Sequence, residues 1–272
     1  MGGKPLALAL ILALTVALAA CGGGDEGAAD GAATGPAEFR TRSPGVLTVA
    51  TELPNPPFVL GDDLDHLKGG FEVDMVGEIA DRLGIERVEW VGFPFTKLVA
   101  GAACPCDFAV NGVSILPERR ELVDFSSPYF TANQGVLVRK GTAVTGVADA
   151  RRLRFGVQEA TSGEAYLERI LKPMEKPRAF ASTMAAFTAL RAGQVEAVMS
   201  DVPIVVDAAA KHPGLTVAGQ FKTDEQYGAV LAKGSPNTRV LSEVIDQLRN
   251  EGVLDQLFQK YFPEQVDIPS LG

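Results

Sequence analysis

A polar loop followed by an arginine is the first feature of the sequence that could do chemistry. The loop contains Asn111, Gly112 and Ser114, and Arg119 follows it. Glycine lets a backbone approach a small ligand, a hydroxyl can donate and accept hydrogen bonds, and an arginine can grip a carboxylate through two parallel hydrogen bonds. The loop therefore suggests a carboxylate site, although Arg119 alone could also be a surface residue in the charged run 118–121.

Two other polar segments follow apolar, strand-like runs. Gln158 ends one run and leads to Thr161 and Ser162, which could offer hydroxyls and free backbone N–H groups to an anion at the start of a helix. Another run ends on Asp201, which could pair with an ammonium group or cap the helix that begins near Pro203. Because open α/β sheets bind ligands at the carboxyl ends of their strands, these segments predict a ligand-binding cleft.

Cysteine and histidine do not predict a metal centre or a cofactor. The chain has three cysteines and two histidines, too few and too badly spaced for the ligand pairs of a zinc site. Cys104 and Cys106 lack the two-residue gap of oxidoreductases, so free thiols and a strained local disulfide both remain open, and we expect a loop feature of structural or no consequence. His66 and His212 lie in polar stretches and are expected to be solvated.

The elements that must position these residues alternate between β-rich and helical runs. This order predicts an α/β fold with largely parallel sheets. Apolar residues at helical spacing predict a helix that stops at Gly84, a helix with Thr183 as its N-cap, and two C-terminal helices separated by Gly252. The predicted strands are 46–50, 87–91, 108–111, 135–139, 153–157, 197–200, 215–218 and 229–232.

Size and charge narrow the function classes. With 272 residues, 46% of them apolar, the chain can bury a core of one or two lobes. A formal net charge of -9 argues against binding to nucleic acid, which requires a positive field to displace counterions.

The first forty residues are predicted to lie outside the fold. Lys4 precedes an apolar run up to Ala20, which is shorter than the roughly 20 residues of a membrane-spanning helix and fits a signal peptide at residues 1–20. The sequence Leu-Ala-Ala-Cys ending at Cys21 resembles a bacterial lipobox, in which the cysteine carries the lipid; a plain secretory signal is the alternative. Residues 21–42, rich in Gly, Ala and Asp over much of their length, are then expected to form a lipidated flexible tether.

An ordered set of short motifs resembles the bacterial extracellular solute-binding proteins of family 3, an amino-acid-binding family. The resemblance runs from about Val46 to Phe262. The motifs are VATE at 49–52, PPF at 56–58, GFEVDM at 70–75, NGVS at 111–114, ER at 118–119, DFS at 124–126, AGQVEAV at 192–198, LRNEG at 248–252 and KYF at 260–262. One departure is the pair Glu159–Ala160, where the family often has a glycine.

The resemblance implies a type II periplasmic-binding-protein clamp with two lobes, two hinge crossovers and the ligand in the cleft. The first lobe would hold residues 43–127 plus 226–272 and the second residues 128–225, with hinges near 127–133 and 223–227. Closure of the lobes would be coupled to ligand binding.

Residue roles carry over position by position from the same resemblance. For the α-carboxylate of the ligand, the matching residues are Arg119, Ser114, Thr161 and Ser162. For the α-amino group they are Asp201, Asn111 and Ser114, with Gly112 allowing a close backbone approach. For the ligand side chain they are Glu52, Asn55, Phe95 and Gln158. Glu52 favours a cationic amino acid or glutamine, because a carboxylate facing an acidic ligand would be costly, and Gln158 in place of a cation weakens a glutamate reading.

The implied function is the extracytoplasmic, lipid-anchored substrate-binding component of an ABC importer. Its expected partners are a free amino acid, a permease in the membrane, and the membrane itself through a lipid on Cys21; we expect a monomer that binds no metal or nucleic acid. Two alternatives use the same fold. A cyclohexadienyl-type dehydratase would need a general acid such as Glu52 or Glu159, and an amino-acid-sensing receptor module would need a separate signalling partner.

Overall fold

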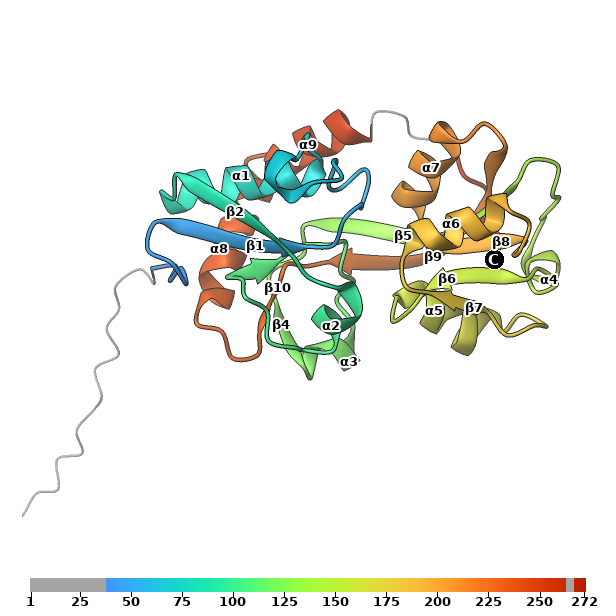
Figure 1. Cartoon of the computed structure of the whole chain (residues 1–272), viewed down its shortest axis with the longest axis horizontal. Helices are drawn as coiled ribbons and strands as arrows, with labels where there is room; N and C mark the ends of the chain where they lie inside the picture. Colours follow the sequence, from blue (N-terminus) through green and yellow to red (C-terminus); the bar gives the residue numbers. More distant parts are fainter. Residues whose placement is uncertain (1–37, 263–266) are drawn as a thin grey trace, which may run out of the picture. The chain divides into compact units, whose positions relative to one another are not determined.

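The computed structural model describes residues 38–262 and 267–272. The predicted signal peptide, Cys21 and most of the predicted tether lie outside the described residues. The described chain forms two five-stranded sheets flanked by helices (Figure 1), so the predicted two-lobed α/β architecture is confirmed. Within residues 38–262 and 267–272, none of the helices is long and apolar enough to cross a membrane.

The first sheet has the strand order β2-β1-β3-β10-β4. Its strands are β1 (Val46–Thr51), β2 (Arg87–Gly92), β3 (Phe108–Ala109), β4 (Val123–Phe125) and β10 (Val230–Ala232). The helices that lie between or after these strands in the sequence are η1 (Leu64–His66), α1 (Phe71–Leu83), α2 (Phe95–Val99), α3 (Pro117–Arg120), α8 (Asn237–Asn250) and α9 (Val253–Tyr261). The apolar stripe of α8, which includes Leu241, Ile245 and Leu248, is buried in the core.

The second sheet has the strand order β7-β6-β8-β5-β9. Its strands are β5 (Phe130–Arg139), β6 (Phe155–Gln158), β7 (Arg178–Phe180), β8 (Ala197–Asp201) and β9 (Leu215–Tyr227). Its helices are α4 (Val147–Ala150), α5 (Ser162–Tyr166), the π-helix η2 (Leu167–Leu171), α6 (Thr183–Arg191) and α7 (Val202–Lys211).

Both sheets are mixed, whereas the sequence predicts mainly parallel ones. β1 pairs in parallel with β2 and β3, and β10 pairs antiparallel with β3 and β4. In the second sheet, β6 pairs in parallel with β7 and β8, while β5 pairs antiparallel with β8 and β9. The antiparallel strands are those next to the two crossings between the sheets, where the chain does not follow the β-helix-β path that makes strands parallel.

The ends of the helices follow local chemistry. Gly84 ends α1 with a left-handed φ of 67°, as predicted, because glycine adopts this conformation without a steric cost. The prediction of Thr183 as an N-cap is wrong by one residue: Ser182 is the N-cap of α6 and its hydroxyl accepts a hydrogen bond from the N–H of Ala185. Thr183 is consequently the first residue of the helix, and its N–H is free of the helix ladder.

Strands β5 and β9 carry both crossings between the sheets. They pair antiparallel from Phe130 with Tyr227 to Arg139 with Leu215, with a register shift at Asn133. The Asn133 side chain accepts hydrogen bonds from the backbone N–H groups of Thr223 and Asp224, which fixes this irregularity. The predicted hinge ranges therefore fall on the ends of two paired strands.

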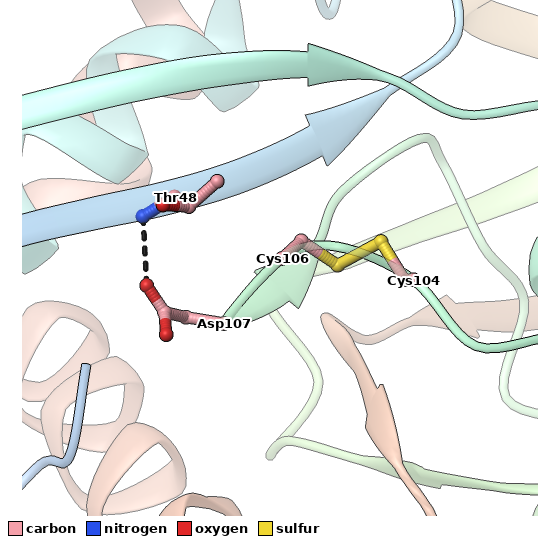
Figure 2. Close-up of a disulfide and its surroundings, with 4 residues drawn as sticks. All are labelled: Thr48, Cys104, Cys106 and Asp107. Atoms are coloured by element: carbon pink, nitrogen blue, oxygen red, sulfur yellow. Dashed lines mark hydrogen bonds between the residues drawn. A yellow bond between two sulfur atoms is a disulfide. The ribbon is translucent and has the colours of Figure 1, made fainter. Parts of the chain in front are cut away.

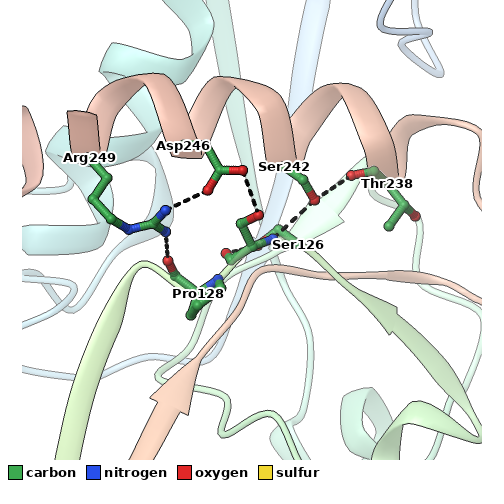
Figure 3. Close-up of polar contacts among 7 residues, drawn as sticks. Ser126, Pro128, Thr238, Ser242, Asp246 and Arg249 are labelled. Carbon is green, nitrogen blue, oxygen red and sulfur yellow. Dashed lines mark hydrogen bonds and ion pairs between the residues drawn. The ribbon is translucent and has the colours of Figure 1, made fainter. Parts of the chain in front are cut away.

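Helix α8 holds the start of β5 (Figure 3). The hydroxyl of Ser242 accepts from the backbone N–H of Ser127 at 3.0 Å, and Asp246 accepts from the Ser127 hydroxyl at 3.0 Å. Arg249 pairs with Asp246 and donates to the carbonyl of Pro128. Ser127 and Pro128, at the start of the predicted hinge, are thus bound to the first lobe, and any bending is expected beyond them.

The last described residues pack on the second sheet. Ile268 and Leu271 are buried, and backbone hydrogen bonds join Gln220 of β9 to Pro269 and Leu271. The sequence-based division places 226–272 in the first lobe, but the last described residues, 268–271, contact β9 of the second lobe.

Cys104 and Cys106 form a disulfide just before β3 (Figure 2), which is one of the two alternatives left open by the sequence. The next residue, Asp107, accepts hydrogen bonds from the backbone N–H groups of Thr48 and Arg42, each at 2.7 Å. This carboxylate ties the loop to β1 and to the segment that leads into it. Of the two histidines, His66 is exposed as predicted, and His212 is half-buried.

Candidate ligand-binding site

A cavity of about 40 Å³ lies between residues of the two lobes. It brings together nearly all the residues predicted to bind a ligand: Asn55, Phe95, Asn111, Gly112, Ser114, Arg119, Gln158, Thr161, Ser162 and Asp201. The remaining predicted residue, Glu52, contacts the cavity through Gln158 and the N–H of Phe95. Cys21 lies outside the described residues. In the described part of the chain, no group of three His, Cys, Asp or Glu side chains is arranged to hold a metal ion.

Arg119 is a buried cation aimed at the cavity. It lies in α3, its side chain is stacked over the ring of Phe95, and only 5% of the residue is exposed. Its guanidinium donates to the carbonyl of Ser114 and to that of Ala160 in the other lobe, each at 2.9 Å. Burial lowers the pKa of Arg119, and the carboxylates of Asp201 and Glu225 oppose this shift. A guanidinium has five N–H donors, so a carboxylate could accept from those that do not face these two carbonyls.

The loop that leads to this arginine is held by a buried acid. Gly112 has a left-handed φ of 58°, and an added Cβ would lie 3.3 Å from the ring of Tyr227. The N–H of Gly112 donates to the Glu72 carboxylate at 2.7 Å, and the hydroxyl of Tyr129 donates to the same oxygen. Burial raises the pKa of Glu72 to about 7, although both hydrogen bonds act to lower it.

Asn55 and Asn111 are joined to each other. The side-chain oxygen of Asn111 accepts hydrogen bonds from Thr51, from the N–H of Glu52 and from Asn55. This oxygen therefore fixes the turn after β1 beside the cavity, and its capacity to accept from a ligand is largely used.

Asp201 ends β8 and is the second charged group of the site. It occupies the N-cap position of α7, but its side chain makes no capping bond. Instead, one carboxylate oxygen accepts from the amide of Gln134 and the other from the hydroxyl of Tyr227 at 2.5 Å. Burial raises the pKa of Asp201 to about 7, and the nearby Glu225 carboxylate adds to the shift. Of the two roles left open by the sequence, the geometry does not support capping.

The segment after β6 contributes from the second lobe. Thr161 caps the short helix α5, because its hydroxyl accepts from the N–H of Glu164 and donates to the carbonyl of Gln158. Ser162 is left to face Ser114, with the two hydroxyl oxygens 3.3 Å apart. Ala160, at the departure from the family pattern, has a left-handed φ of 60°, a conformation that explains why glycine is common there.

Comparison with known proteins identifies the family. The sequence profile named "Bacterial extracellular solute-binding proteins, family 3" matches residues 47–264. The chain belongs to this family.

Relatives of this family 3 protein span most of its length. It is 27% identical over 235 residues to the L-cystine-binding protein TcyJ of Escherichia coli (strain K12), covering 84% of this chain and 86% of the relative. It is 29% identical over 205 residues to the ABC transporter glutamine-binding protein GlnH of Bacillus subtilis (strain 168), covering 72% of this chain and 73% of the relative. Among solved structures, an ancestral arginine-binding protein bound to arginine matches with a TM-score of 0.72 and 29% identity over 83% of this chain and 100% of that one. The type II fold is thereby confirmed.

Several polar residues of the site in this family 3 protein are not predicted by the sequence: Thr183 and Ser200 line the cavity, and Gln134 and Glu225 bond to its predicted residues. Gln134 is fully buried in β5 and donates to Asp201, to Glu225 at 3.0 Å and to Ser162 at 3.3 Å. Glu225 of β9 also accepts from the hydroxyl of Ser114 at 2.6 Å. Both lie on the crossing strands, and a signal that could have found them is a polar residue inside or beside each predicted hinge range.

Proposed function

We propose that this chain is the extracytoplasmic substrate-binding component of an ABC importer for a polar amino acid. The observation that carries this proposal is that the buried Arg119 and the half-buried Asp201, two groups of opposite charge, line one cavity. An α-amino acid has an anionic and a cationic end, and this pair complements both. The TcyJ and GlnH relatives are binding proteins for amino acids, which supports the same ligand class.

In the proposed complex, the α-carboxylate lies against Arg119, Ser114 and the Thr161–Ser162 segment. The α-ammonium lies against Asp201, near Asn111. The far end of the ligand meets Glu52, Asn55, Phe95 and Gln158, where Glu52 favours glutamine or a cationic amino acid over an acidic one.

In the proposed function, ligand binding is coupled to movement of the lobes. A cavity of about 40 Å³ has space for about three water molecules, which is too little for an amino acid. Direct hydrogen bonds between the lobes hold the cleft closed. Among them are the bonds of Arg119 with Ala160 and of Gln158 with Glu52. The ligand therefore enters after the lobes separate, and it replaces some of these contacts when they close again. A permease would meet the closed, loaded form.

The N-terminal part of the proposal concerns export and anchoring. Residues 1–20 act as the signal peptide, Cys21 receives the lipid, and residues 21–42 form the tether to the membrane. Metabolic labelling with a fatty-acid analogue tests this: the wild type should be labelled and Cys21→Ala should not, and equal labelling of both would exclude Cys21 as the acceptor.

A thermal-shift screen over the twenty amino acids tests the ligand class. A ligand at 100 times its Kd adds about 2.7 kcal/mol to the free energy of unfolding, which corresponds to a rise in Tm of roughly 5 °C or more. We expect such a rise with one or a few polar, non-acidic amino acids. No rise with any amino acid, together with turnover of a dienyl substrate, would replace the transport proposal with the dehydratase alternative.

A further inference from the structure

The side-chain end of the cleft is built around one glutamine and one glutamate. Gln158 ends β6 in the second lobe, and Glu52 follows β1 in the first. The amide nitrogen of Gln158 donates to one oxygen of the Glu52 carboxylate at 2.9 Å. The other oxygen of Glu52 accepts from the backbone N–H of Phe95 at 2.8 Å.

The amide of Gln158 has only one orientation that satisfies its neighbours. Its oxygen accepts from the Thr183 hydroxyl at 2.7 Å and from the Thr183 N–H at 3.2 Å. A backbone N–H can only donate, so the amide atom that faces it must be the oxygen. A carboxylate can only accept, so the amide atom that faces Glu52 must be the NH₂ group. Reversing the amide would set its NH₂ group against the Thr183 N–H and its oxygen against the Glu52 carboxylate, and only the contact with the Thr183 hydroxyl, which can also accept, would survive.

Thr183 can impose this orientation because of its place in α6. It is the first helical residue after the Ser182 cap, so its N–H has no partner within the helix. Thr183 and Gln158 belong to the same lobe and both line the cavity. The orientation is therefore set within the second lobe and does not depend on closure of the cleft.

The fixed amide places a donor and an acceptor side by side. A primary amide of a ligand complements this pair, since its oxygen can accept from Gln158 while its NH₂ donates to Glu52. A guanidinium or ammonium group only donates, so it would meet the Gln158 NH₂ group with a second donor. Both oxygens of Glu52 already accept one hydrogen bond each from the protein, which reduces the room for a bidentate guanidinium.

We propose that Thr183 is a positioning residue that orients the Gln158 amide, and that the site thereby selects an amino acid with a primary amide side chain. This inference rests on the proposed function, because it assumes an α-amino acid held by Arg119 and Asp201. Glu52 by itself is compatible with two classes of ligand side chain, the cationic and the amide side chains. The inference retains only the amide class.

Titration calorimetry with glutamine, asparagine, arginine and lysine tests the inference. In the wild type, glutamine or asparagine should bind at least tenfold more tightly than arginine or lysine. Thr183→Val removes the hydroxyl at nearly constant volume and leaves the N–H in place, so the Gln158 amide is held by one hydrogen bond fewer and the amide-over-cation ratio should fall about fivefold. Thr183→Ser keeps the hydroxyl and should restore the ratio. The matched control is Thr188→Val on the exposed side of α6; among the described residues the Thr188 hydroxyl forms hydrogen bonds with Met184 and Arg191 alone, and this variant should leave the ratio unchanged.

Gln158→Glu provides a second, independent variant. It replaces the donor with an oxygen beside Glu52, so the preference should reverse toward arginine or lysine. An unchanged preference for the amide in this variant would overturn the inference. A wild type that binds arginine or lysine more tightly than glutamine and asparagine would also overturn it while leaving the proposed function intact. Failure to bind any amino acid would overturn both.

Discussion

Replacing Glu72 by glutamine should change how the stability of the protein depends on pH. Glu72 is fully buried, and burial raises its pKa from 4.5 to about 7. For an acid whose pKa is higher in the folded state, the native protein holds the proton more tightly than the unfolded chain does. Stability is therefore lost as pH rises from about 4.5 to about 7, and the full cost of the buried charge is present above this window.

The size of the effect follows from the two pKa values. A shift from 4.5 to about 7 corresponds to about 3 kcal/mol between the acid and alkaline ends of the window, since one pKa unit is about 1.4 kcal/mol. Glutamine carries no charge at either pH and can still accept from Gly112 and Tyr129. Its NH₂ group replaces an oxygen that has no hydrogen-bond partner among the described residues, and this adds a cost that does not vary with pH.

Urea denaturation of the wild type and of Glu72→Gln, at acid and at mildly alkaline pH, measures the effect. The free energy of unfolding of the variant minus that of the wild type should increase by about 3 kcal/mol from pH 4.5 to pH 8. Taking this difference removes all costs that are independent of pH. A difference that stays constant within about 1 kcal/mol would show that Glu72 does not titrate as a buried acid. In Tyr129→Phe, loss of the hydrogen bond should move the transition to higher pH.

Two further predictions concern the ligand and the C-terminal residues. Because the pKa of Asp201 is raised to about 7, protonation of its carboxylate should weaken amino-acid binding about tenfold for each pH unit below this value. Asp201→Asn should abolish this pH dependence. Calorimetry across pH 5–8 measures it, and a wild-type Kd that does not change with pH would contradict the prediction. Leu271→Ala should destabilise the protein by about 2–3 kcal/mol because Leu271 is buried near β9, whereas the exposed Ser270→Ala should change little; equal unfolding midpoints for both variants would show that this packing does not contribute to stability.

The sequence predicts the fold well where apolar residues are periodic. All eight predicted strands form, and Gly84 ends α1 as expected. β4 and β7 are missed because neither contains an apolar run: Asp124 interrupts β4, and two of the three residues of β7 are exposed. β5 and β9 are longer than predicted because polar residues such as Asn133, Gln134 and Glu225 interrupt the apolar pattern toward the hinge. The single-residue error at Thr183 has a different cause: Ser182 and Thr183 are adjacent and both are good N-cap residues.

Residues that line the candidate cavity were predictable where they stand in loops or short helices after strands, or match a motif of the family, and Gln134 and Glu225 were missed. Arg119, Ser114 and Asp201 stand after apolar runs, and the resemblance to the family assigns each a role. Gln134 and Glu225 lie within long antiparallel strands, where alternating polar residues normally indicate a solvent face. Only the pairing of β5 with β8 and β9 brings these two side chains to Asp201 and Ser114.

The most direct test of the proposed function is calorimetry of Arg119→Ala beside Arg120→Ala. The two arginines are neighbours in α3, but Arg119 is buried on the cavity and the side chain of Arg120 is exposed. Arg119→Ala should weaken the binding of every amino acid that the wild type binds by at least about 30-fold, because all share the α-carboxylate, and Arg120→Ala should bind like the wild type. Unchanged affinity in a folded Arg119→Ala protein would contradict the central claim.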